Sequence, residues 1–122
     1  MPKMHPEKAE PYFLSIECSG RVGSAALGRG PDLLEEVVFS GKMRHSSELF
    51  PVLTRILKSA GCTPGDIHAL CFTAGPGSFT GLRIAVTVAK MMNFAQNTRL
   101  VAVNTLDAIA ENATEYVLIK RE

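Results

Sequence analysis

The fold is decided by one stretch of the sequence, Gly75-Pro76-Gly77-Ser78-Phe79-Thr80-Gly81-Leu82-Arg83. A short apolar run at residues 67–73 precedes it, and such runs are typical of strands buried on both faces. Ser78 can cap a following helix, because its hydroxyl can accept from a backbone N–H two or three residues further on. The stretch therefore predicts a strand, a tight turn and a helix in succession.

A glycine-rich turn before a helix can hold a phosphate, because the free N–H groups of the first helical turn point outward. The spacing here matches neither common phosphate motif. A P-loop needs Gly-Lys-Ser/Thr after its second glycine, and this turn has no lysine. The dinucleotide fingerprint would need its third glycine one residue before Gly81. Spacing alone therefore leaves phosphate binding open without indicating it.

The helix predicted from Ser78 to about residue 94 is apolar around almost its whole circumference. A helix of this kind needs burial on more than one side, and a sheet can cover only one of them. Gly81, Ala85 and Ala89 place a small residue at every fourth position, a spacing that permits close helix approach. We expect this helix to pair with a helix of a partner. The alternative is that the first helix and the N-terminal arm cover the surplus face within the monomer.

The rest of the chain predicts a mixed sheet. Strands at 12–17, 22–27 and 34–39 are closely spaced and suggest an antiparallel meander. An amphipathic helix follows, with its apolar positions between Leu49 and Ala60, Ser46 or Ser47 as cap, Pro51 in or near the first turn, and Gly61 at its end. A strand at 100–103, a short helix at 105–112 and a further strand candidate at 116–119 complete the order. The order βββαβαβα, linked by helices in its second half, places this chain in the α/β class.

The length and net charge of the chain limit the number of domains and the kinds of partner that we expect. With 122 residues the chain can build one ordinary core, and its net charge of +1 provides no global field for a nucleic acid. No apolar run reaches the ~18 residues of a membrane span, and residues 1–11 lack the apolar core of a signal peptide. Three prolines and mixed charges predict that these eleven residues form a flexible arm. We therefore expect a cytoplasmic protein with no membrane contact.

The sequence shows no metal-binding or catalytic motif. Three cysteines, at positions 18, 62 and 71, show no C-x-x-C spacing, and the three histidines include no pair four residues apart. There is no G-x-S-x-G elbow. The sequence predicts no metal site, no resident cofactor and no catalytic residue.

Three segments of the sequence resemble a known family. The segments concerned are His45-Ser46-Ser47-Glu48-Leu49-Phe50-Pro51, the glycine-rich turn 75–84 and Asn104-Thr105-Leu106-Asp107-Ala108-Ile109-Ala110. In this order they resemble the N-terminal lobe of the TsaB family, across about residues 12–112. TsaB is the bacterial partner of the enzyme TsaD in forming threonylcarbamoyladenosine on tRNA. The resemblance implies an actin/Hsp70/sugar-kinase fold, which is ribonuclease H-like, with a five-stranded mixed sheet.

The resemblance also implies partners. It predicts a noncatalytic dimerisation subunit whose two main helices form a bundle with a TsaD-like subunit or with a second copy, with a TsaE-like ATPase in the complex and tRNA contacted only indirectly. ATP and magnesium would then enter through the partner complex. The residues expected at the interface are Leu49, Leu53, Phe79, Leu82, Ala85, Val86 and Ala89.

Departures from the family pattern leave two alternatives open. Glu17 stands where this fold usually carries an aspartate, and the chain stops at Glu122, where the family continues into a second lobe. We expect a single lobe over residues 12–122 with the second lobe absent, as a fragment or a natural short form. The first alternative is an ATP-binding enzyme of the same fold, with phosphates held by Glu17, Ser19, Gly75, Gly77 and Ser78. The second is a homodimeric remnant without a TsaD partner.

Overall fold

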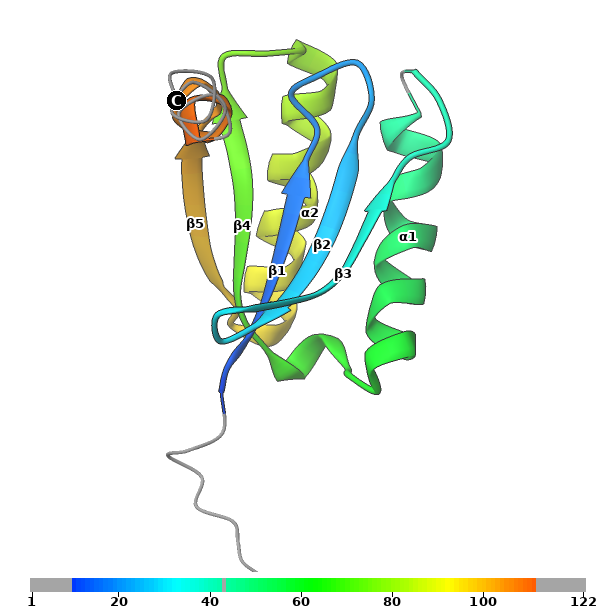
Figure 1. The fold of residues 1–122 in the computed structure, drawn as a ribbon, viewed down its shortest axis with the longest axis vertical. Coiled ribbons are helices and arrows are strands. Elements are labelled where there is room, and N and C mark those ends of the chain that lie inside the picture. Colours follow the sequence, from blue (N-terminus) through cyan, green and yellow to red (C-terminus); the bar gives the residue numbers. More distant parts are fainter. Residues whose placement is uncertain (1–9, 43, 112–122) are drawn as a thin grey trace, which may run out of the picture.

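The computed structural model describes residues 10–42 and 44–111, which form a five-stranded sheet with helices on it (Figure 1). The strands are β1 (Tyr12–Glu17), β2 (Ser24–Arg29), β3 (Asp32–Val38), β4 (Ile67–Gly75) and β5 (Arg99–Asn104). The helices are α1 (His45–Ala60), α2 (Phe79–Gln96), the short 3₁₀ helix η2 (Pro64–Asp66), and a helical segment at residues 105–111. The predicted arm lies largely outside the described residues, as does the strand candidate at 116–119.

The strand order is β3-β2-β1-β4-β5, with the first three strands antiparallel and β1, β4 and β5 parallel. The predicted mixed sheet is thus confirmed. β2 and β3 each begin about two residues from their predicted starts. The physical reason is the hairpin register: Tyr12 pairs with Arg29, so the pairing with β1 sets the position of β2. Gly30 makes the next turn at a φ of 57°, where glycine has no steric cost.

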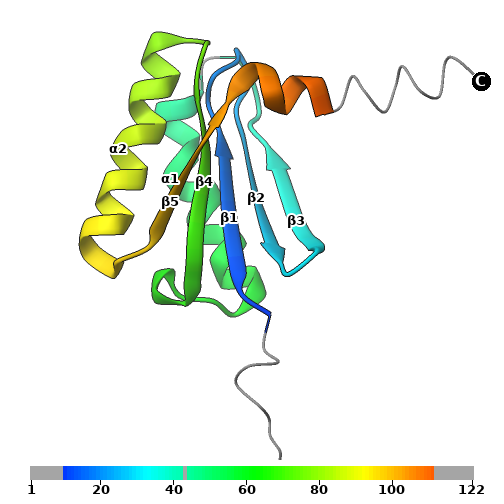
Figure 2. The ribbon, with the colours of Figure 1, turned by 90° about the vertical axis from the view of Figure 1, so that its left-hand side faces the viewer.

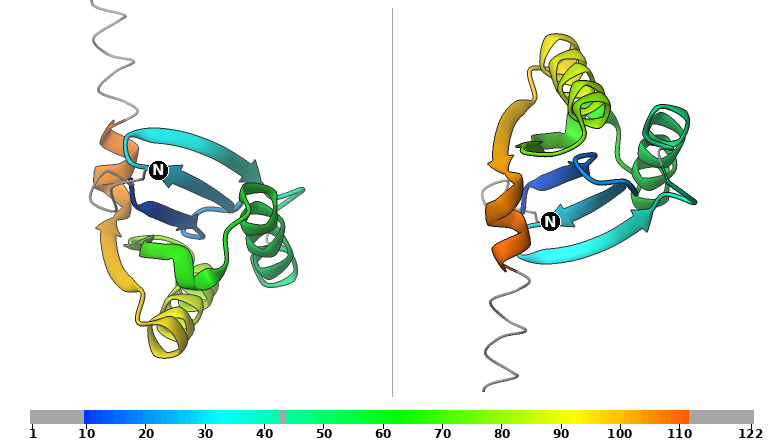
Figure 3. Two further views of the ribbon diagram at one scale, coloured as in Figure 1. Left: turned by 90° about the horizontal axis from the view of Figure 1, so that it is seen from below. Right: turned by 90° about the horizontal axis from the view of Figure 1, so that it is seen from above.

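Both long helices cover one face of the sheet, as Figure 2 shows from the side. Segment 105–111 crosses near the carboxyl ends of the parallel strands, on the side of the sheet away from α1 (Figure 3). The core lies between the sheet and the two helices, where side chains of alternating strand positions meet the apolar stripes of the helices. Its fully buried members include Leu14, Ile16, Leu27, Leu49, Ile56 and Leu70.

The start of α1 differs from the prediction. The helix begins at His45, after Arg44 as N-cap residue, and no side chain of the described residues caps it, so Ser46 and Ser47 are not caps. A tertiary contact anchors the first residue of the helix: His45 is 2% exposed, and its Nε2 lies 2.8 Å from the Gly20 carbonyl oxygen. Because the helix starts early, Pro51 is its seventh residue and lies inside it rather than in the first turn.

The end of α1 and the start of α2 agree with the prediction, and α2 runs to Gln96, two residues past its predicted end at about residue 94. Gly61 ends α1 in the left-handed conformation, and Ser78 caps α2 by accepting from the Gly81 N–H at 3.2 Å. Asn97 ends α2, also in the left-handed conformation. No helix in the described part of the chain is long and apolar enough to cross a bilayer.

Candidate functional site

Two turns meet where β1 ends and α2 begins. The backbone N–H of Ser78 donates to the Ser19 carbonyl oxygen at 2.7 Å. A Cβ added to Gly77 would lie 2.5 Å from that same oxygen, so only glycine permits this approach. Gly75 has a φ of 126°, which side chains rarely adopt. The structure therefore brings together four of the five residues that the sequence predicts for phosphate binding, namely Glu17, Ser19, Gly77 and Ser78.

The Glu17 carboxylate lies inside this meeting point. It accepts from the Ser19 N–H at 2.6 Å, from the Ser19 hydroxyl, and from the Thr73 hydroxyl of β4 at 2.7 Å. A hollow of about 260 Å³ borders the carboxylate, and the helical segment 105–111 forms its other wall. Next to it, burial and the negative charge of Glu17 raise the pKa of the Cys18 thiol to about 11. A thiol held neutral in this way is not a nucleophile at neutral pH.

This arrangement does not fit a nucleotide phosphate. A phosphate site in this fold would need free N–H and hydroxyl donors near the end of β1, and here the donors of Ser19 and Thr73 point at the chain's own carboxylate. The carboxylate would also repel a second anion. Among the residues that the structure describes, no three His, Cys, Asp or Glu side chains gather in a metal-binding cluster.

The small-residue stripe of α2 packs inside the chain, which corrects the prediction that it faces a partner helix. Gly81, Ala85 and Ala89 are all buried. A Cβ on Gly81 would lie 1.8 Å from the Cys18 carbonyl oxygen and 2.8 Å from Cδ2 of His45. At Gly81, therefore, helix α2 closely approaches the end of β1.

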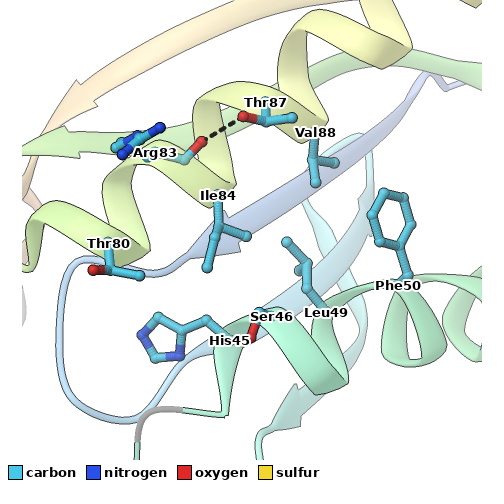
Figure 4. Close-up of a pocket in the computed structure, with 9 residues that line it drawn as sticks. All are labelled: His45, Ser46, Leu49, Phe50, Thr80, Arg83, Ile84, Thr87 and Val88. Carbon is cyan, nitrogen blue, oxygen red and sulfur yellow. Dashed lines mark hydrogen bonds between the residues drawn. The ribbon is translucent and has the colours of Figure 1, made fainter.

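A groove runs between α1 and α2. Two hollows of about 360 Å³ and 260 Å³ share Phe50 and Val88 as lining residues, so they lie end to end. Figure 4 shows the first, with Ile84 and Thr80 of α2 facing His45 and Leu49 of α1. The second is bounded by apolar side chains for most of its length, among them Leu53, Leu57, Met91 and Met92.

The rim of the groove exposes large apolar side chains. Phe50 is 51% exposed and Met91 is 52% exposed, although both line the second hollow. Exposed apolar groups gathered at a concave surface are typical of sites that bind another protein or an apolar ligand.

The seven residues predicted at an interface separate into two groups. Leu49 and Leu53 line the groove, yet both are buried, as are Ala85 and Ala89. Phe79, Leu82 and Val86 line neither hollow: at 100° per residue, Val86 is about 200° around α2 from Ile84. Ala85 and Ala89 belong to the buried stripe described above. Contact of a partner with the other five residues stays a prediction.

Sequence reasoning missed Phe50, Ile84 and Met91 as groove residues. A signal for two of them was present, since Thr80, Ile84, Thr87 and Met91 recur at three- and four-residue steps along one face of α2. Which of several apolar faces stays open depends on where α1 packs, and a helix that is apolar all round does not reveal it.

Sheet order and helix placement define a ribonuclease H-like α/β lobe. RuvC of Thermus thermophilus, bound to a Holliday junction substrate, shares this fold with a TM-score of 0.50 at 9% identity, over 79% of this chain and 66% of its own. YeaZ from Pseudomonas aeruginosa is nearer, with a TM-score of 0.77 at 29% identity over 87% of this chain and 49% of its own. The predicted fold is thus confirmed.

A family model described as TsaD: tRNA N6-adenosine threonylcarbamoyltransferase matches residues 32–119. The tRNA threonylcarbamoyladenosine biosynthesis protein TsaB of Bacillus subtilis is 30% identical over 104 residues, which are 85% of this chain and 45% of the relative. TsaB of Escherichia coli is 35% identical over 69 residues, 57% of this chain and 30% of the relative. The chain belongs to this family, and its matches identify it as an N-terminal lobe of the TsaB type. It spans less than half the length of these relatives.

Proposed function

We propose that this chain is a noncatalytic subunit that takes part in threonylcarbamoyladenosine formation on tRNA by binding a TsaD-type partner through α1 and α2. Two observations support a role in threonylcarbamoyladenosine formation. The matching family model is named for tRNA threonylcarbamoyltransferase, and the relatives are named for threonylcarbamoyladenosine biosynthesis. The fold alone would not support it, because this fold carries many unrelated functions.

The groove between α1 and α2 carries the proposal. Its floor is apolar, and Phe50 and Met91 stand half exposed at its rim. Covering such side chains is worth roughly 25 cal/mol per Å² of apolar surface removed from water. A partner helix placed along the groove would bury both rim residues while leaving the core of this chain unchanged, because an amphipathic helix lays its apolar face into grooves of this kind.

A noncatalytic role agrees with the turn site. Glu17 is hydrogen bonded to Ser19 and Thr73, and the Cys18 thiol beside it is kept neutral by burial. These groups hold the end of β1 and the start of α2 in place. In the proposed role they support the groove, and the transfer chemistry takes place in the partner.

The test is association with the TsaD-type protein encoded in the same genome, measured by co-purification and by titration. Phe50→Glu and Met91→Glu each place a charge at the rim, on side chains that are already half exposed, so the fold should survive. Each variant should weaken binding at least about 30-fold, which corresponds to the ~2 kcal/mol of an interface hot spot. Ala85 is unsuitable for this test, because it is fully buried and an arginine there would disrupt the core.

The matched control is Leu33→Glu. Leu33 is 65% exposed on the edge strand β3 and lines neither hollow of the groove. It should leave binding unchanged. Parental affinity in both groove variants would refute the groove as the binding surface. Light scattering of the chain alone separates a TsaD-type partner from a second copy: a dimer that both rim variants dissociate, without any affinity for TsaD, would assign the groove to self-association instead.

A further inference from the structure

The Glu17 carboxylate is enclosed by donors from the turn after β1 and from strand β4, which are far apart in the sequence. Ser19, two residues on, donates its backbone N–H at 2.6 Å and also its hydroxyl; Thr73, 56 residues on, donates its hydroxyl at 2.7 Å. Ser19 and Thr73 are each 7% exposed. Three donors that converge in a nearly buried place form a strong site for a negatively charged oxygen, because hydrogen bonds to charged acceptors are about twice as strong as neutral ones.

The same donors have the chemistry of a phosphate cradle. Backbone N–H groups at a turn and hydroxyls at strand ends are the groups that hold phosphate oxygens in proteins. A hollow of about 260 Å³ borders the site, lined by Glu17, Ser19, Gly20, Val22, Thr105, Ala108 and Ile109. The hollow and the hydrogen-bond donors are therefore both present, but the Glu17 carboxylate already accepts the donors' hydrogen bonds.

We propose that Glu17 is an internal anion that occupies an anion cradle built by Ser19 and Thr73. In the parent chain the cradle is closed to phosphate. Replacing the glutamate side chain with the methyl group of alanine frees the three donors and opens the cradle to inorganic phosphate from the neighbouring hollow. The inference concerns this turn alone and does not depend on the partner proposed for the groove.

The closed cradle has a second consequence for the fold. Ser19 also accepts the Ser78 N–H through its carbonyl oxygen at 2.7 Å. Glu17 therefore connects β4, through the Thr73 hydroxyl, to the turn at Ser19. The same turn holds Ser78, the residue just before α2. Its carboxylate fixes the position of a turn that in a phosphate-binding protein would be ordered by its ligand.

The experiment is a titration of the full chain with inorganic phosphate, followed by the NMR amide resonances of Ser19 and Thr73. Glu17→Ala should show saturable shifts in the millimolar range, and the parent should show none. Adding Thr73→Val to Glu17→Ala removes one hydroxyl donor and should weaken phosphate binding at least several-fold. Saturation in the parent would overturn the proposal and would favour the ATP-binding alternative. A folded Glu17→Ala chain without saturation would overturn it as well.

A measurement on the parent chain keeps the proposal testable if Glu17→Ala does not fold. The Ser19 amide of the parent should exchange its proton with solvent slowly, because the Glu17 carboxylate accepts from it at 2.6 Å. Thr73→Val should leave that protection in place, since it removes a different donor. A Ser19 amide that exchanges as fast as an open turn would show that the carboxylate lies elsewhere and would overturn the proposal.

Discussion

Replacing Gly81 with alanine tests where the small-residue stripe of α2 packs. The added Cβ would lie 1.8 Å from the carbonyl oxygen of Cys18, and ordinary contact begins at 3.4 Å. Helix α2 would have to move away from the end of β1 by about 1.6 Å to restore contact. The opposing atom belongs to the backbone of the strand end, so no side-chain rotation can relieve the overlap.

Two opposing effects set the size of the loss. Alanine is a better helix former than glycine by about 1 kcal/mol, which favours the variant. Overpacking a well-packed core costs about 1–3 kcal/mol and more where the backbone must move. Because the overlap here is severe, we expect the overpacking to exceed the gain and the free energy of unfolding to fall by at least about 2 kcal/mol. For a chain of 122 residues a loss of that size lowers Tm by roughly 6–12 °C.

Urea unfolding and thermal melts of the isolated chain measure the effect. Gly41→Ala is the matched control, because the nearest atom to an added Cβ there is a side-chain carbon of Arg44 at 3.7 Å. It should change the free energy of unfolding by no more than about 0.5 kcal/mol. If Gly81→Ala were as stable as the parent but failed to bind TsaD, the stripe would be a partner surface and the internal packing described above would be refuted.

Two further predictions concern the cap of α2 and the buried thiol. Ser78→Ala removes the acceptor of the Gly81 N–H and should lower the free energy of unfolding by about 1 kcal/mol in urea titrations, whereas Ser46→Ala should change little, because Ser46 does not cap α1. A loss in Ser46→Ala equal to that in Ser78→Ala would contradict the assignment of the caps. The pKa of Cys18 is raised from 9.0 to about 11 by burial and by Glu17, so its contribution to stability is complete below pH 9 and is lost as the pH rises toward 11. Melts across this range should show the fall, and Cys18→Ala should flatten it; an unchanged slope in that variant would assign the fall to other groups.

Local patterns in the sequence determined most of the elements. The apolar run before Gly75, the capping serine at position 78 and the glycine at position 61 each act within a few residues, so strand, helix start and helix end could be predicted where the structure places them. The antiparallel meander and the parallel second half followed from the lengths of the connections. The start of α1 did not follow, because His45 is anchored by Gly20, a residue 25 positions earlier in the sequence.

The use of the glycine-rich turn was decided by tertiary structure alone. Gly81, Ala85 and Ala89 are all buried, but a helical repeat does not say which surface lies opposite, and at Gly81 that surface is the end of β1. Four of the five residues predicted for phosphate binding meet in space, yet their chemistry depends on where one carboxylate points. Sequence determined which residues gather at this turn; the packing of β1, β4 and α2 decided that Glu17 fills the cradle and that the open apolar surface lies between α1 and α2.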